Sequence, residues 1–285
     1  MPEDILENVS ESEYSMPPRP FLRWAGSKRL LLRHLSPLVP KSFGTYFEPF
    51  VGSASLYFHL RPKNAVLNDK ASEVINLYSA IKSDVEAVLA ACKEFENNKE
   101  RYYAVRENRS TNPMVRAAEF LFLNKTCWNG LYRVNASGGF NVPYGNNKVK
   151  AIVDSDNLRS CARLMAETDV VLLNSDFETA VEEAKSGDFV YFDPPYVTGH
   201  NNNGFLHYNE KIFSWDDQVR LAKLAKRLVN QGVNVLVSNA DHQDVAALYD
   251  DFVKTSILRN STISGNTEKR GPITEMIFHV NGLEA

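Results

Sequence analysis

Cysteines are few in this 285-residue sequence: there are three, and no two of them form a Cys-x-x-Cys pair. The six histidines are scattered and form no His-Glu-x-x-His pattern. Neither a disulfide framework nor a metal site is therefore predicted. No apolar run approaches the ~20 residues that a membrane-spanning helix needs, and the first residues are acidic and polar, unlike a secretory signal. We expect a cytoplasmic protein that binds neither metal nor membrane.

The Gly-x-Gly-x-x-Gly fingerprint of dinucleotide-binding proteins is also missing. The loop at residues 51–55, which follows a predicted strand, has Gly52 as its single glycine. A pyrophosphate needs more room than such a loop offers, which argues against a nicotinamide-dependent dehydrogenase. A nucleoside without phosphates fits better, and Asp69, after the next predicted strand, is placed to bind a ribose. A helix N-cap is the alternative role for Asp69.

Acidic residues are absent between Glu119 and Asp154. The same interval contains four basic residues: Lys125, Arg133, Lys148 and Lys150. Over residues 95–150, nine Lys and Arg stand against four Glu, a local charge of +5 in a chain whose net charge is −3. Aromatic residues interleave with these bases, as is typical of a segment that faces nucleic acid. A solvated loop with a chance shortage of acids remains the alternative.

Residues 1–19 carry five acids, one arginine and little apolar periodicity, so a flexible acidic tail is predicted. Strands and helices alternate through the rest of the chain. Strands are expected at 45–50, 65–67, 170–173, 189–192 and 233–237, and helices at 28–39, 72–97 and 215–230. This alternation favours a mostly parallel α/β sheet with ligands at the carboxyl ends of its strands.

The apolar run at 189–192 is followed directly by Asp193, Pro194, Pro195 and Tyr196. A carboxylate and a backbone carbonyl accept hydrogen bonds from an exocyclic amine, while a tyrosine stacks on a ring. The prolines fix φ and offer no N–H, so their carbonyls point in a set direction. The tetrapeptide suits a site that grips a flat, amine-bearing ring. A turn that merely ends a strand is the alternative.

Three distinctive segments follow one another along the chain: Phe-Leu-Arg-Trp-Ala-Gly-Ser-Lys at 21–28, Phe-Glu-Pro-Phe-Val-Gly-Ser-Ala-Ser at 47–55 and Asp-Pro-Pro-Tyr at 193–196. They resemble signature motifs of the Dam-type DNA adenine-N6 methyltransferases. Residues 125–135 and 139–145 resemble the target-recognition segment of that family, and 238–241 and 261–278 continue the match. The resemblance covers about residues 20–280. It departs at Ser27 and Ala54, where the family usually has glycine.

This resemblance implies an α/β fold, namely a Rossmann-like S-adenosylmethionine-dependent methyltransferase sheet with a small inserted helical and hairpin target-recognition domain. The catalytic domain would comprise residues 20–92 and 151–285, and the insertion residues 93–150. The implied activity is site-specific methyl transfer from S-adenosylmethionine to N6 of an adenine flipped out of double-stranded DNA, with GATC or a related site as target. A monomer or weak dimer at the nucleoid is expected.

In the resemblance, Asp193 and the Pro194 carbonyl accept the two N–H bonds of the adenine amine, beside Pro195, and Tyr196 stacks on the ring. Eight residues are expected at the cofactor: Trp24, Lys28, Phe50, Gly52, Asp69, Asp176, Phe177 and Asp193. Lys28 would pair with the cofactor carboxylate, Asp69 with the ribose, and Asp176 with Phe177 would cradle the adenine. For Phe50, simple core packing is the favoured alternative.

Seven residues are expected at the DNA: Arg23, Trp128, Asn129, Leu131, Arg133, Asn135 and Pro143. Arg133 would make a bidentate contact to guanine O6 and N7, the commonest specific pairing. Trp128 would act as a wedge where the adenine leaves the stack. Residues 139–145 are expected to form a hairpin turn beside them.

Two other functions stay open from the sequence. One is a methyltransferase-like DNA-recognition subunit that has lost catalysis, which the complete tetrapeptide at 193–196 and Lys28 argue against. The other is an enzyme that methylates RNA or a protein amide. Such relatives often carry Asn in place of the leading Asp, and the basic central segment suits duplex DNA better.

Overall fold

The computed structural model describes residues 17–135, 137–146, 149, 151–196, 213–260 and 272–280. Most of the predicted acidic tail lies outside these residues. So do Lys148, Lys150 and the first part of the family-like stretch at 261–278.

A seven-stranded sheet in the order β3-β2-β1-β4-β5-β7-β6 forms the centre of the described chain. Its strands are β1 (Tyr46–Glu48), β2 (Asn64–Asn68), β3 (Asp169–Leu173), β4 (Phe189–Phe192), β5 (Asn234–Ala240), β6 (Val253–Asn260) and β7 (Pro272–His279). Strands β1 to β5 pair in parallel, and β7 runs antiparallel between β5 and β6. The predicted α/β class with a mostly parallel, Rossmann-like sheet is confirmed.

Alternate residues of the central strands enter two different cores. In β4, Phe189 and Tyr191 belong to one hydrophobic cluster, whereas Val190 and Phe192 belong to the other. Successive side chains of a strand point to opposite faces, so a strand covered on both sides is apolar throughout. This explains why the run at 189–192 is continuously hydrophobic and fully buried.

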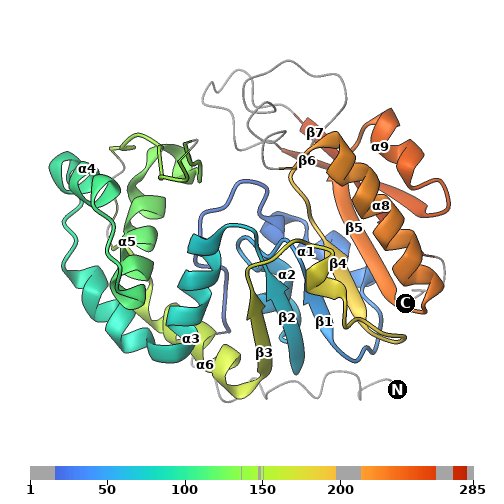
Figure 1. Cartoon of the computed structure of the whole chain (residues 1–285), viewed down its shortest axis with the longest axis horizontal. Helices are drawn as coiled ribbons and strands as arrows, with labels where there is room; N and C mark the ends of the chain where they lie inside the picture. Colours follow the sequence, from blue (N-terminus) through green and yellow to red (C-terminus); the bar gives the residue numbers. More distant parts are fainter. Residues whose placement is uncertain are drawn as a thin grey trace.

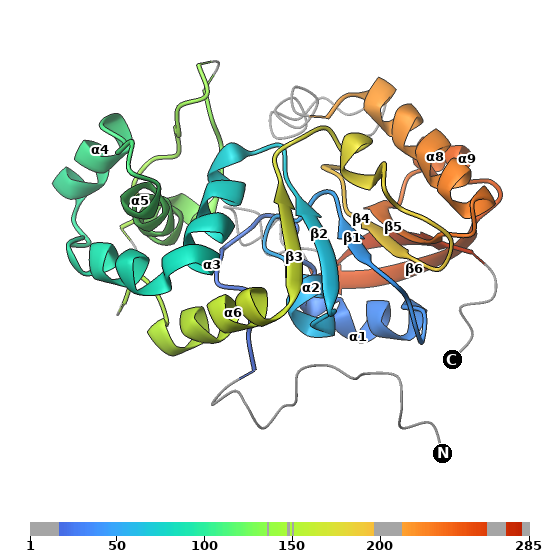
Figure 2. The same cartoon turned by 60° about the horizontal axis from the view of Figure 1, so that its bottom comes forward.

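Helices cover the sheet and extend beyond its β3 edge. Their bounds are α1 (Leu32–Leu35), α2 (Ser55–Leu60), α3 (Ser72–Lys93), α4 (Lys99–Glu107), α5 (Pro113–Thr126), α6 (Ser155–Glu167), α8 (Trp215–Asn230) and α9 (Gln243–Leu248). In both views α4 and α5 lie beyond β3, at the left, whereas α8 and α9 lie at the right (Figures 1 and 2). Among the residues that the structure describes, no helix is both long and apolar enough to cross a membrane.

Two predicted helices differ from the observed ones. Residues 28–39 form two 3-10 turns, Lys28–Leu30 and Ser36–Leu38, around the four-residue α1. Pro37 cannot donate a helical hydrogen bond, which explains why α1 ends at Leu35. The helix expected at 72–97 ends at Lys93 and is broken at Asp84, whose φ is −154°. The Asp84 carboxylate accepts the Ala87 N–H at 2.9 Å, which starts the second half of α3.

The segment between α3 and α6 holds α4, α5 and a loop. The N-terminus of α5 is fixed by Asn112, whose side chain accepts the N–H groups of Met114 and Val115, and by Pro113 in its first turn. Buried aromatic residues of α5 share one hydrophobic cluster with α3 and the sheet. The assignment of residues 93–150 to a separate target-recognition domain remains a prediction.

The expected hairpin turn at 139–145 was placed wrongly along the chain. The chain reverses between Asn135 and Gly139, since Asn135 N–H donates to Gly139 O at 2.8 Å and Gly138 adopts φ +81°. Isolated antiparallel bridges join Val134 to Phe140 and Cys127 to Tyr144, so 140–144 is the returning arm. Glycine at 138 permits the left-handed turn, because a Cβ would strain that conformation.

Candidate active site

A cavity of about 580 Å³ opens where β1, β2 and β4 end. This volume lies within the roughly 300–1,000 Å³ of small-molecule sites. All eleven residues predicted at the catalytic or cofactor position line it: Trp24, Lys28, Phe50, Gly52, Asp69, Asp176, Phe177, Asp193, Pro194, Pro195 and Tyr196. Segments far apart in sequence thus meet at one sheet edge, as parallel topology dictates. The individual roles of these residues remain predictions.

Asp193 follows the last residue of β4 and is paired with Lys28. The Lys28 ammonium lies 2.7 Å from Asp193 Oδ1, with side-chain exposures of 4% and 18% respectively. The ammonium also donates to the Gly26 carbonyl at 2.8 Å. Because a nearly buried ammonium needs such partners, the pair fixes both side chains at the cavity wall. The sequence predicted Lys28 and Asp193 at one site but not their contact.

Tyr196 is held from a distant strand. Its hydroxyl donates to Glu275 Oε2 at 2.7 Å, and the Lys28 ammonium lies 4.9 Å from the centre of its ring. Burial, and then the nearby Asp193 and Glu275 carboxylates, raise the pKa of the Tyr196 phenol well above its usual range. The phenol therefore remains a hydrogen-bond donor at neutral pH. Glu275 was missed because nothing in the sequence links β7 to the tetrapeptide.

Glu48 is a second acid that the sequence did not single out. It ends β1, lines the cavity and accepts a hydrogen bond from the Tyr46 hydroxyl at 2.9 Å. Burial raises the pKa of Glu48 to about 8, against the lowering effect of the Tyr46 hydrogen bond. The Glu48 carboxyl is therefore neutral at pH 7 and adds no charge beside Asp193.

Asp69 and Trp24 approach the loop at Gly52 from two sides. Asp69 Oδ2 accepts the Gly52 N–H at 3.0 Å, and Oδ1 accepts the Ala71 N–H at 2.9 Å. Burial raises the pKa of Asp69 to about 6 despite these two hydrogen bonds. A Cβ on Gly52, whose φ is +43°, would lie 2.5 Å from Trp24 Nε1. Glycine is required there because the indole packs against the backbone.

Three phenylalanines form an apolar wall of the cavity. Phe50 stacks on Phe177 with ring centroids 5.5 Å apart and meets Phe213 edge-on at 5.6 Å. Arg220 covers the outer face of this wall, 4.8 Å from the Phe177 ring centre, and donates to Asp176 at 2.9 Å. Phe50 thus both packs with other rings and faces the cavity.

Three serine hydroxyls meet at the cavity wall. Ser27 Oγ lies 2.9 Å from Ser55 Oγ, and Ser53 Oγ lies within 3.1 Å of both. The hydroxyl of Ser27, at a position where the family usually has glycine, therefore ties the segment that carries Lys28 to the loop after β1. Ala54, at the other departure, adopts a left-handed φ of +53°.

None of the seven predicted DNA-contacting residues lines the cavity. Six of them lie within residues 128–143, and Arg23 directly precedes Trp24 of the lining. Tyr132 joins the two regions, since it stacks on Trp24 with ring centroids 5.2 Å apart and also lines the cavity. Arg133 is exposed, and its guanidinium donates to the Asn141 side chain at 2.7 Å. Trp128 is 44% exposed, a high value for a tryptophan. Such a ring at the surface is available to another molecule.

The other predicted DNA contacts have structural partners. Asn135 Oδ1 accepts the Gly139 N–H at 2.8 Å, so its carboxamide supports the turn. The backbone of Arg23 exchanges two hydrogen bonds with the Asn124 side chain, at 2.9 and 2.7 Å. Asn129 has a left-handed φ of +55°. The Leu131 carbonyl accepts a hydrogen bond from the Cys127 thiol, and the Pro143 carbonyl accepts one from the Trp128 N–H. Their contacts with DNA stay predictions.

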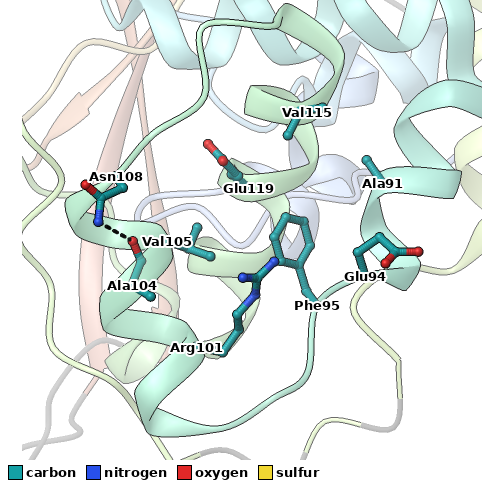
Figure 3. A pocket seen from close by; sticks show the side chains of 9 residues that line it. All are labelled: Ala91, Glu94, Phe95, Arg101, Ala104, Val105, Asn108, Val115 and Glu119. Atoms are coloured by element: carbon teal, nitrogen blue, oxygen red, sulfur yellow. Dashed lines mark hydrogen bonds between the residues drawn. The ribbon is translucent and has the colours of Figure 1, made fainter.

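A second cavity, of about 410 Å³, lies between the end of α3, α4 and α5 (Figure 3). Arg101 lies over the Phe95 ring at 5.2 Å. Glu119, the buried acid on its wall, already accepts from Arg109 and Ser110 at 2.9 Å. None of the motif residues lines this second cavity. Within the described ranges no cluster of His, Cys, Asp or Glu is able to hold a metal ion.

The sheet order, together with Asp-Pro-Pro-Tyr at the carboxyl end of β4, defines a Rossmann-like methyltransferase that acts on an amine. The chain belongs to the D12 class N6 adenine-specific DNA methyltransferase family, a model of which matches residues 24–265. It is therefore an enzyme that methylates adenine in DNA at specific sites, as the sequence predicted.

Curated relatives match nearly the whole chain. The Type II methyltransferase M1.LlaDCHI of Lactococcus lactis subsp. cremoris is 39% identical, over 91% of this chain and 94% of the relative. The DNA adenine methylases of Haemophilus influenzae and Escherichia coli are 32% and 30% identical, each over 91% of this chain and 92% or more of the relative. A conserved hypothetical protein of Streptococcus pyogenes with a solved structure has a TM-score of 0.35 at 11% identity, over 91% of this chain and 98% of that one.

Proposed function

We propose that this chain transfers a methyl group from S-adenosylmethionine to N6 of an adenine that has been flipped out of duplex DNA, within GATC or a related site. The observation that supports it most is the single cavity that gathers all eleven residues assigned to catalysis and cofactor binding. A chance grouping of motifs would leave some of them on other surfaces.

The cavity has the chemistry that S-adenosylmethionine needs. Asp69 offers carboxylate oxygens for ribose hydroxyls, and the wall of Phe50 and Phe177 offers an apolar face for an adenine ring. Gly52 lets the Trp24 indole pack against the backbone after β1, which places the indole in the cavity lining. When bound, S-adenosylmethionine supplies an electrophilic methyl group on a sulfonium centre.

The tetrapeptide after β4 would hold the target base. Asp193 and the Pro194 carbonyl accept the two N–H bonds of the adenine amine, because both are acceptors and proline fixes the backbone direction. The nitrogen lone pair is then directed away from the ring plane, towards the methyl donor. Positioning, and the negative charge of Asp193 beside an amine that becomes cationic, provide the rate enhancement. Tyr196 stacks on the base.

The Asp-Pro-Pro-Tyr segment lines a cavity, and an adenine that is stacked and paired inside a duplex cannot enter it. Base flipping is therefore part of the proposal. Unstacking and unpairing require a few kcal/mol. Trp128 is the proposed wedge that fills the space left in the stack. Its ring is exposed, and Tyr132, four residues further along the chain, stacks on Trp24 in the cavity lining. Arg133, held by Asn141, is the proposed reader of a guanine.

The remaining expectations follow from the substrate. DNA in a bacterial-type cell lies in the cytoplasm, so the enzyme is proposed to act at the nucleoid. One cavity contains the whole proposed cofactor and base site, so a monomer or weak dimer suffices.

The test is nucleoside mass spectrometry of DNA treated with the purified protein and S-adenosylmethionine. We expect N6-methyladenine, and sequencing of the modified sites will show whether they are GATC. Methylation of RNA or protein instead, or cofactor binding without any methyl transfer, would overturn the proposal.

A further inference from the structure

Glu275 is a buried acid at a position where the strand pattern predicts an apolar residue. It lies on β7, is 1% exposed and is the register partner of Ala240 in β5 and of Ile257 in β6. Ile277, two residues further along the same face of β7, is fully buried in the core. A carboxylate at such a position is expensive to bury unless it has polar partners.

Two of its partners belong to the proposed catalytic site. Glu275 Oε2 accepts the Tyr196 hydroxyl at 2.7 Å and lies 3.7 Å from the Lys28 ammonium. The Lys28 ammonium is in turn 2.7 Å from Asp193. One lysine therefore lies between two carboxylates, and one of these carboxylates also holds the tyrosine of the tetrapeptide.

This arrangement has a consequence for Asp193. Without Glu275, the Lys28 ammonium would bind the Asp193 carboxylate more strongly. It would then compete with the adenine amine for the lone pairs of that carboxylate. A second negative charge near the ammonium weakens that competition, because repulsion between the Glu275 and Asp193 carboxylates offsets part of the attraction of Asp193 to Lys28. It also leaves the site with a net negative charge where a cationic amine develops.

Glu275 has a second consequence for Tyr196. Without a partner for its hydroxyl, the Tyr196 side chain would rotate between several conformations. Stacking on a base would then cost the conformational entropy of ordering the ring. The charge-assisted hydrogen bond to Glu275 fixes the hydroxyl end in advance. Neutral Glu48 does not share this role, because its hydrogen bond goes to Tyr46.

We propose that Glu275 is a positioning residue for methyl transfer: it anchors Tyr196 for stacking on the flipped base and shares Lys28, so that Asp193 remains available to the adenine amine. This inference rests on the proposed function. It assigns to Glu275 of β7, which was not among the predicted site residues, a part in the chemistry at β4.

The experiment compares Glu275→Gln with Glu275→Ala. Glutamine keeps an acceptor for Tyr196 but loses the charge, so we expect kcat to fall about tenfold with KM for DNA within about twofold. Alanine loses both, so we expect kcat to fall about 100-fold or more and base flipping to weaken. Flipping is measured by the fluorescence of 2-aminopurine placed at the target adenine of a duplex.

A double-mutant cycle with Tyr196→Phe tests the anchor directly. If the hydroxyl acts through Glu275, the Tyr196→Phe change has no further effect on flipping in the Glu275→Ala background. The matched control is Tyr249→Phe, a buried tyrosine that stacks on Phe278 of β7 outside the cavity lining, which should leave flipping and kcat unchanged.

Wild-type kcat in Glu275→Gln would overturn the counter-charge role, and independent effects of Tyr196→Phe and Glu275→Ala on flipping would overturn the anchor. Thermal melting identifies variants that are unfolded, and Glu275→Gln keeps the inference testable if Glu275→Ala does not fold. Failure of the wild-type protein itself to methylate adenine would instead overturn the proposed function.

Discussion

The ammonium of Lys28 lies 2.7 Å from the carboxylate of Asp193, although the two residues are 165 positions apart. The lysine comes from the Gly26-Ser27-Lys28 segment and the aspartate from the end of β4. The acid proposed to bind the adenine amine is therefore oriented before any substrate arrives. Such preorganisation avoids rearrangement at the moment of transfer.

Asp193→Ala should abolish methyl transfer almost completely while the fold survives. The variant loses the proposed acceptor of the amine, and we expect a fall in kcat of about 10²–10³-fold or more. It also leaves Lys28 without its nearest carboxylate, which should lower the free energy of unfolding by about 1–3 kcal/mol. Radiolabelled methyl transfer and urea unfolding measure the two effects.

The control for this variant is Asp169→Ala, an exposed aspartate at the start of β3, at the opposite end of the sheet. It should keep wild-type turnover. Substantial residual turnover in Asp193→Ala would contradict the mechanism.

Arg133→Ala should relax the choice of DNA sequence. Loss of a bidentate contact to guanine is expected to remove at least ~1 kcal/mol of discrimination at one base pair. Asn141→Ala, which removes the carboxamide that holds the guanidinium, should have a smaller effect at the same base pair. The measurement is kcat/KM on duplexes in which each position of the site is replaced in turn.

Arg227→Ala removes an exposed arginine of α8 and serves as the charge-matched control. If Arg133→Ala keeps the wild-type order of preference among these duplexes, Arg133 is not the reader.

Gly52→Ala should weaken binding of S-adenosylmethionine. The new Cβ would lie 2.5 Å from Trp24 Nε1, so the indole must leave the cavity wall. We expect the Kd, measured by calorimetry, to rise about tenfold or more, which corresponds to about 1.4 kcal/mol. Unfolding should be easier by about 1 kcal/mol, because φ is +43° at this position.

Gly187→Ala provides the matched control, because Gly187 has φ +87° but no atom within 4 Å of the added Cβ. It should show a similar loss of stability with an unchanged Kd. Equal Kd values for the two variants would mean that Trp24 takes no part in cofactor binding.

Glu48 should make the protein less stable as pH rises. The folded state keeps the proton of Glu48 up to a pKa of about 8, whereas the unfolded chain releases it near the usual glutamate pKa of 4.5. Between these values the unfolded state binds fewer protons, so this group lowers the free energy of unfolding by up to about 1.4 kcal/mol per pH unit. Glu48→Gln stays neutral and should lose this contribution.

Urea unfolding at several pH values between the two pKa values tests this. We expect a flatter profile for Glu48→Gln than for the wild type, and a wild-type profile for Glu182→Gln, which changes an exposed carboxylate. A Glu48→Gln profile parallel to that of the wild type would show that Glu48 is ionised in the folded protein.

The local elements follow from the sequence because their causes are local. The continuous apolar run before Asp193 predicted β4 with its observed bounds. The predicted helix at 215–230 is α8, where Ser214 and Asp217 form a capping box. Where a local cause was overlooked, the prediction was wrong: Pro37 ended α1 early, Asp84 broke α3, and the hairpin turn lies at Gly138.

The sequence by itself also determined that the motifs after β1, β2, β3 and β4 gather at one site, since the carboxyl ends of parallel strands meet at one sheet edge. Only the tertiary structure decided how those residues pair. Glu275 reaches Tyr196 and Lys28 because antiparallel β7 lies beside β5, and a pairing between strands leaves no trace at either position in the sequence. The neutral state of Glu48 likewise depends on burial, which many distant residues provide together.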